Sequence, residues 1–106
     1  LVDITAAWCV TCKVNKAFVI DRPDIARRLS TDIVPLQGNW TRPDTKISSF
    51  MKEHGRYGLP FNIVFGPGAP EGIALPELLS KAALMAAFDR ALSKSTNLIT
   101  QPREKQ

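Results

Sequence analysis

The chain has 106 residues, of which 44% are apolar and 23% are charged, with a net charge of +4. This composition is ordinary for one globular domain, and the dispersed basic residues do not predict a nucleic-acid-binding surface. No apolar run approaches the roughly 18 residues of a membrane span, so direct membrane insertion of this stretch is not expected.

Apolar periodicity and turn residues divide the chain into alternating strands and helices. The predicted elements, in chain order, are a strand at 1–6, a helix at 9–18, a helix from 21 to about 29, a strand at 33–37, a helix from 43 to 54, a strand at 61–65, an edge strand from 72 to about 79 and a helix from 81 to about 93. With the two consecutive helices at 9–18 and from 21 to about 29 counted as one helical unit, the order is βαβαββα, which predicts an α/β fold with a central mixed sheet flanked by helices.

Several details accompany this prediction. Val14 and Phe18 are spaced to face the core from the first helix, and Asp21 is expected to cap the second. The proline- and glycine-rich stretch 66–70 reads as a turn. The polar residues 94–106 lack periodicity, so we expect a domain at 1–93 followed by a flexible polar tail.

Both cysteines of the chain, Cys9 and Cys12, lie three positions apart where the first strand gives way to a helix. This C-x-x-C arrangement is typical of a redox dithiol. Cys9 would sit at the helix N-terminus, where the helix dipole favours its thiolate. We therefore predict that Cys9 is the exposed nucleophile that attacks a partner disulfide and that Cys12 is the buried resolving thiol.

The residues around this pair carry a family resemblance. The matching stretches are Asp3, Trp8-Cys9-Val10-Thr11-Cys12-Lys13-Val14-Asn15, Asn39-Trp40-Thr41, Gly58-Leu59-Pro60-Phe61 and Phe65-Gly66-Pro67-Gly68. Together they resemble the thioredoxin superfamily, and within it the C-terminal thioredoxin-like domain of DsbD/ScsB-type transmembrane thiol–disulfide reductases. The resemblance covers residues 2 to about 92. It implies a thioredoxin-like fold that here lacks the family's N-terminal strand and helix, which would leave an uncovered sheet edge.

The resemblance also implies roles for residues outside the dithiol. Asp3 would accept the proton of Cys12, although a purely structural carboxylate is the alternative. Pro60 would be cis and face the dithiol, and the backbone of Leu59 would pair with a bound partner strand. Trp8 would pack against the core, contact the partner, or do both.

Two lysines are candidates for tuning the dithiol. Related domains often carry a glutamate seven residues after the first cysteine, and Lys16 stands there in this chain. A lysine near Cys9 would favour its thiolate and lower its pKa, and Lys13 would act in the same sense.

The family context implies a periplasmic domain of a bacterial inner-membrane protein. Such a domain would take electrons from a membrane-embedded donor of the same parent protein and reduce other thiol–disulfide proteins or domains. It would need no cofactor beyond the redox-active disulfide Cys9–Cys12.

The same two cysteines allow an alternative of another class. Thiolates bind Cu(I), so a copper-handling module is the alternative function. A zinc site is not expected, because zinc needs four ligands and His54 is the one histidine of the chain.

Overall fold

The computed structural model describes residues 1–93, and the predicted tail at 94–106 lies outside the described residues. Its strands are β1 (Val2–Thr5), β2 (Leu36–Asn39), β3 (Phe61–Gly66) and β4 (Ala69–Ala74). They form one mixed sheet in the order β2-β1-β3-β4. β1 runs parallel to β2 and antiparallel to β3, and β3 pairs antiparallel with β4.

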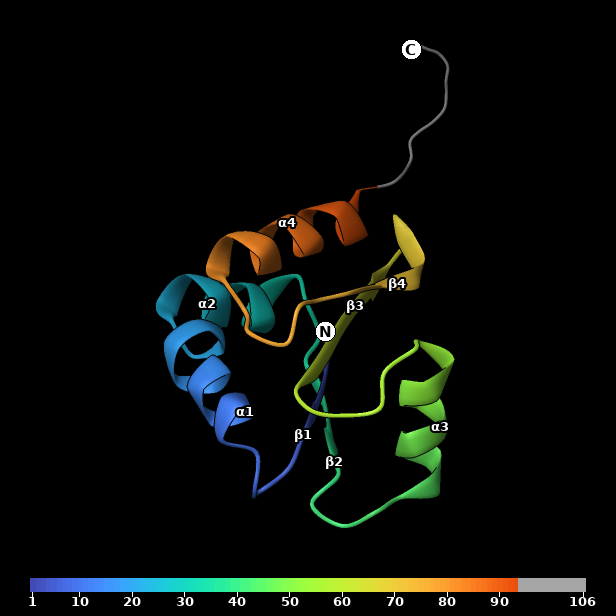
Figure 1. Cartoon of the computed structure of the whole chain (residues 1–106). Coiled ribbons are helices and arrows are strands. Elements are labelled where there is room, and N and C mark those ends of the chain that lie inside the picture. Colours follow the sequence, from blue (N-terminus) through green and yellow to red (C-terminus); the bar gives the residue numbers. More distant parts are fainter. Residues whose placement is uncertain (94–106) are drawn as a thin grey trace.

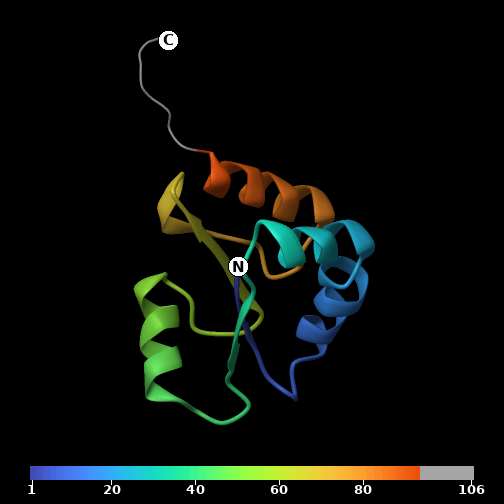
Figure 2. The same cartoon turned by 180° about the vertical axis from the view of Figure 1, so that it is seen from behind.

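Helices cover both faces of this sheet (Figures 1 and 2). Their bounds are α1 (Val10–Asn15), the π-helical turn η1 (Lys16–Ile20), α2 (Pro23–Thr31), α3 (Thr45–Glu53) and α4 (Lys81–Leu92). Figure 1 shows α3 on one side of the sheet and α1, α2 and α4 on the other. The predicted α/β architecture, a central mixed sheet flanked by helices, is therefore confirmed. Within residues 1–93, every helix is too short or too polar to cross a membrane.

Alternation along the strands sends side chains to two separate cores. Ile4, Phe61 and Ile63 pack with Met51 of α3 on one face. Val64 belongs to the second core on the opposite face, with α2 and α4. The two faces of β1 and β3 thus have different neighbours, and the dithiol lies on the side of α1.

Local sequence signals explain where most helices begin. Asp44 caps α3, its carboxylate accepting hydrogen bonds from the N–H groups of Lys46 and Ile47. The prediction that Asp21 caps α2 is wrong, because Pro23 occupies the first helical position and leaves Arg22 as the cap. Asp21 instead ends η1.

The prediction that Val14 and Phe18 face the core is also wrong. Val14 lies near the surface, Phe18 is 72% exposed, and Val19 is buried instead. The buried positions are Cys12, Asn15 and Val19, which are spaced i, i+3 and i+7 on one helical face. The apolar pair Val14 and Phe18 therefore indicated the wrong face, because the inward face includes the polar Asn15.

Both edge strands differ in extent from the prediction. β4 begins at Ala69 rather than Gly72, because Pro67 and Gly68 alone connect it to β3. Pro70 then lies within β4, where an edge strand tolerates a residue without an N–H group. β2 begins at Leu36 instead of Ile33, and Leu36 is 60% exposed at the other edge of the described sheet.

Candidate active site

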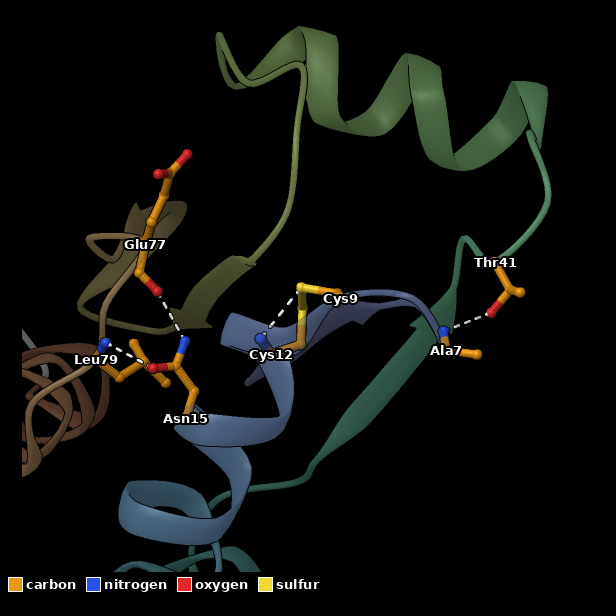
Figure 3. Close-up of a disulfide and its surroundings, with 7 residues drawn as sticks. All are labelled: Ala7, Cys9, Cys12, Asn15, Thr41, Glu77 and Leu79. Carbon is orange, nitrogen blue, oxygen red and sulfur yellow. Dashed lines mark hydrogen bonds between the residues drawn. A yellow bond between two sulfur atoms is a disulfide. The ribbon is translucent and has the colours of Figure 1, made fainter.

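Cys9 and Cys12 form a disulfide where β1 leads into α1 (Figure 3). A turn closed by a 3.1 Å hydrogen bond from the Cys9 N–H to the Ala6 carbonyl brings the chain back toward the helix. The predicted difference in exposure is wrong for this disulfide form, since Cys9 is 5% exposed and Cys12 6%. The reason is that both half-cystines form one buried cluster with Ala6, against which Leu59 packs.

The sulfur of Cys9 serves as the N-cap of α1. Its Sγ accepts a hydrogen bond of 3.1 Å from the Cys12 N–H. The first turn of α1 contains no acidic residue that would oppose a negative charge there. In a reduced pair the same N–H and the helix dipole would stabilise a Cys9 thiolate, which is the species that attacks disulfides.

The segment before Cys9 is held by the loop that follows β2. The N–H of Ala7 donates to Oγ1 of Thr41 at 2.9 Å, and the indole N–H of Trp8 donates to the Thr41 carbonyl at 3.1 Å. The ring of Trp8 lies 6.3 Å from that of Trp40 and remains more than half exposed. Trp8 therefore packs against the loop and also presents a surface beside the dithiol.

The loop before β3 contributes Leu59 and Pro60. Their peptide bond is cis, so the predicted conformation of Pro60 is confirmed. Leu59 packs against Cys9 and Cys12, and Pro60 is buried. The pairing of the Leu59 backbone with a partner strand stays a prediction.

Asp3 lies on β1, and its side chain is on the face of the sheet toward α1, opposite to the face of Ile4. Burial raises the pKa of its carboxyl above the ordinary value of 3.8, and the charge of Lys16 opposes this with a smaller lowering effect. A carboxyl whose pKa lies above the usual range is a better proton acceptor near neutral pH. The raised pKa agrees with the predicted role of Asp3 as a proton acceptor, and that role stays a prediction.

The two candidate lysines occupy different surroundings. The ammonium of Lys16 forms an ion pair with Asp21 at 2.7 Å, and both side chains are about half exposed. Lys13 lies on the exposed side of α1. The charge of Lys16 thus lowers the pKa of the Asp3 carboxyl. An effect of Lys13 or Lys16 on the pKa of Cys9 stays a prediction.

Sequence reasoning missed Asn15, which is 2% exposed. Its Nδ2 donates to the Glu77 carbonyl at 2.7 Å, and its Oδ1 accepts from the Leu79 N–H at 3.0 Å (Figure 3). These bonds tie the segment before α4 to the dithiol helix. A polar residue three positions after Cys12, next to apolar positions, was the available signal.

Comparison with known proteins agrees with this geometry. The family model described as thioredoxin-like matches residues 1–67. The chain belongs to the thioredoxin-like family. Among curated proteins, none matches the chain significantly.

Solved structures extend the likeness of this thioredoxin-like domain to most of the described chain. The C-terminal domain of DsbD from Neisseria meningitidis is 19% identical, with TM-scores of 0.66 in its reduced form and 0.69 in its oxidised form. Each match covers 85% of this chain and 77% of the other. A thioredoxin from Thermus thermophilus is 17% identical, with a TM-score of 0.63, covering 84% of this chain and 69% of that one.

The thioredoxin-like fold and the Cys9–Cys12 disulfide support thiol–disulfide redox activity. Across residues 1–93, no three His, Cys, Asp or Glu side chains gather in a set that could hold a metal ion. The copper-handling alternative rests on the two thiols alone and stays a prediction.

Proposed function

We propose that this domain is a protein-disulfide reductase module. Its Cys9–Cys12 dithiol would pass electrons to disulfides of other thiol–disulfide proteins or domains. The observation that carries this proposal is the disulfide itself, capped by the Cys12 N–H at the start of α1 and flanked by the cis Leu59–Pro60 loop. No cofactor beyond this disulfide takes part.

The reaction balances with the residues at hand. The Cys9 thiolate attacks one sulfur of the partner disulfide, so that a mixed disulfide forms and one partner thiolate leaves. Cys12 then gives its proton to the Asp3 carboxylate and attacks the Cys9 sulfur. The Cys9–Cys12 disulfide forms, the second partner thiolate leaves, and two electrons have passed to the partner.

The surfaces around the dithiol support a protein as the substrate. The exposed ring of Trp8 and the exposed Val10 lie on either side of Cys9 along the chain. Leu59 packs against the cluster of Ala6, Cys9 and Cys12 from a separate loop. Together they offer apolar contacts and a free backbone segment for an extended partner chain.

The proposed setting is the bacterial periplasm. Support comes from the likeness of the fold to the DsbD C-terminal domain and from the motif resemblance around the dithiol. In this setting a membrane-embedded part of the same parent protein would return electrons to the Cys9–Cys12 disulfide after each transfer.

The reduction potential tests the reductase direction. The 106-residue chain would be equilibrated with glutathione or dithiothreitol buffers, and its thiols would be alkylated and counted by mass. A reductase should have a potential below about −200 mV, toward the thioredoxin range. A potential near about −120 mV, typical of a strong oxidant, would overturn the proposed direction.

A further inference from the structure

A buried acceptor on β3 has no donor within the described part of the chain. It is Oδ1 of Asn62, whose residue is 2% exposed. Buried polar atoms of native proteins are nearly always hydrogen-bonded, so an acceptor of this kind calls for a physical explanation. Asn62 lies beside the candidate active site and has no part in the reaction as described so far.

The strand register places Asn62 directly opposite Asp3. In the antiparallel pairing of β1 and β3, Asp3 faces Asn62 and Ile4 faces Phe61. Directly opposed residues point to the same face, with Cβ atoms about 4.5–5.5 Å apart. Ile4 and Phe61 belong to the core under α3, so Asp3 and Asn62 share the opposite face.

The protonation state of Asp3 decides whether it can satisfy this acceptor. An ionised carboxylate only accepts hydrogen bonds, whereas a protonated carboxyl also carries an O–H donor. We infer that Oδ1 of Asn62 accepts a hydrogen bond from the protonated carboxyl of Asp3 and so positions the proton that leaves Cys12.

This inference deepens the proposed function and rests on it for its catalytic meaning. When Cys12 attacks Cys9, its proton moves to the Asp3 carboxylate. Asp3 therefore holds the proton directly after this step, and Asn62 would supply the acceptor for it. Asn62 contacts neither sulfur in this account, so it is a positioning residue.

The groups around Asp3 determine whether its pKa is expected to rise or to fall. Lys16, from the helix packed on this face, favours the ionised form, and burial favours the neutral form. Gln37 of β2, the neighbour on the other side, is uncharged. A hydrogen bond to the protonated carboxyl adds to the effect of burial and raises the pKa of Asp3 further.

The wild-type chain provides a test that needs no variant. Carbon-13 NMR of the disulfide form would follow the Asp3 carboxyl and the Asn62 side-chain carbonyl against pH. We expect both carbons to titrate with the same midpoint. If the Asn62 carbonyl does not respond when Asp3 titrates, the inference is wrong.

The Asn62→Leu variant then measures the effect of the acceptor. Its loss should lower the pKa of Asp3 by about 0.5 to 1, the equivalent of one ordinary hydrogen bond. A merely structural effect has the opposite sign, because leucine makes the site less polar and would raise the pKa. An unchanged or raised pKa would overturn the inference, and a raised value would indicate that the amide N–H donates to the carboxylate instead.

Ile63→Val is the matched control. It trims a fully buried residue of the same strand on the opposite face, so it should lower stability and leave the Asp3 pKa unchanged. Both titrations use the isolated disulfide form without a partner. Failure of thiol–disulfide exchange would therefore overturn the proposed function and leave the Asp3–Asn62 result intact, and the converse also holds.

Discussion

Helices cover both faces of β1 and β3, but the strand side chains on the two faces differ in polarity. Under α3 the strands contribute Ile4, Phe61 and Ile63, which pack with Met51 in an apolar cluster, and the guanidinium of Arg56 lies 5.4 Å from the centre of the Phe61 ring. On the face toward α1 the same strands contribute Asp3 and Asn62. The side chains that β1 and β3 contribute to one face are thus apolar, while those on the other face include a carboxyl and an amide besides the apolar Val64.

This difference separates residues that contribute to stability from residues that take part in the proposed reaction. Burying a carboxyl or an amide costs free energy unless a partner compensates, so the face toward α1 is the less stable way to fill the space. Natural proteins accept such costs mainly at functional sites. Substitutions on the two faces should therefore have different effects on stability and on thiol–disulfide exchange.

Removing either cysteine should abolish turnover, with different products. Cys9→Ser should lose all exchange, because no nucleophile remains at the helix N-terminus. Cys12→Ser should still attack and should accumulate a mixed disulfide, visible on a non-reducing gel with a disulfide-containing protein such as insulin. Reduction of insulin by the Cys9→Ser variant would show that the roles are assigned wrongly.

Truncating the apolar face should damage stability alone. Met51→Ala removes a side chain that is 1% exposed, so the free energy of unfolding should fall by about 2–5 kcal/mol. The rate of thiol–disulfide exchange of the folded variant should match the wild type, since Met51 is on the face away from the dithiol. Urea denaturation and an insulin-reduction assay measure the two quantities. A large loss of exchange in a folded variant would refute the division between the faces.

Changing the polar face should have the reverse pattern. Asp3→Asn removes the proposed proton acceptor and should slow resolution of the mixed disulfide by at least about tenfold at neutral pH. Its fold should be intact, because an amide replaces a carboxyl of nearly the same shape. Rapid-quench analysis of the mixed disulfide gives the rate. A wild-type rate would assign Asp3 a structural role.

The pH dependence of stability should report Asp3 as well. Its folded pKa is raised above 3.8, so the folded state binds the proton more tightly than the unfolded chain does. The stability that this proton contributes is present below pH 3.8 and is lost as the pH rises through the raised pKa. The Asp3→Asn variant should therefore gain stability relative to the wild type over that range, as measured by urea midpoints. A constant difference at every pH would contradict the raised pKa.

Lys16 should give the smallest effect. Lys16→Gln removes a charge that lowers the pKa of Asp3, so that pKa should rise slightly. The ion pair with Asp21 is about half exposed, and its loss should cost less than about 1 kcal/mol. Lys13→Gln, on the exposed side of α1, is the control and should leave Asp3 unchanged. Equal titration curves for all three proteins would show that Lys16 is too well solvated to matter.

The sequence predicted those parts of the site that local patterns encode. A C-x-x-C pair after a strand indicated the dithiol, and the family resemblance supplied Asp3 and the cis conformation at Pro60. It did not predict the hydrogen bonds of Asn15 or the pairing of Asn62 with Asp3. These depend on strand register and on segments more than 50 positions away in the chain, which no local pattern contains.

The fold, like the site, was predictable only where local sequence patterns determine it. Element order and the caps of α3 and α4 follow from apolar periodicity and from Asp44 and Ser80. The inward face of the first helix did not follow, because it is formed by Cys12, the polar Asn15 and Val19, whereas the apolar pair Val14 and Phe18 indicated a different face. The start of β4 was missed for another reason, since Pro70 reads as a turn residue until its position on a sheet edge is known.

The most direct test of the central claim is the stoichiometry of electron transfer. The reduced chain would be mixed with excess insulin, and free thiols on both proteins would be alkylated and counted by mass while circular dichroism follows the fold. We predict that one insulin disulfide is reduced for each chain that forms the Cys9–Cys12 disulfide, with the domain folded throughout. A chain that transfers no electrons, or transfers them only when unfolded, would contradict the account.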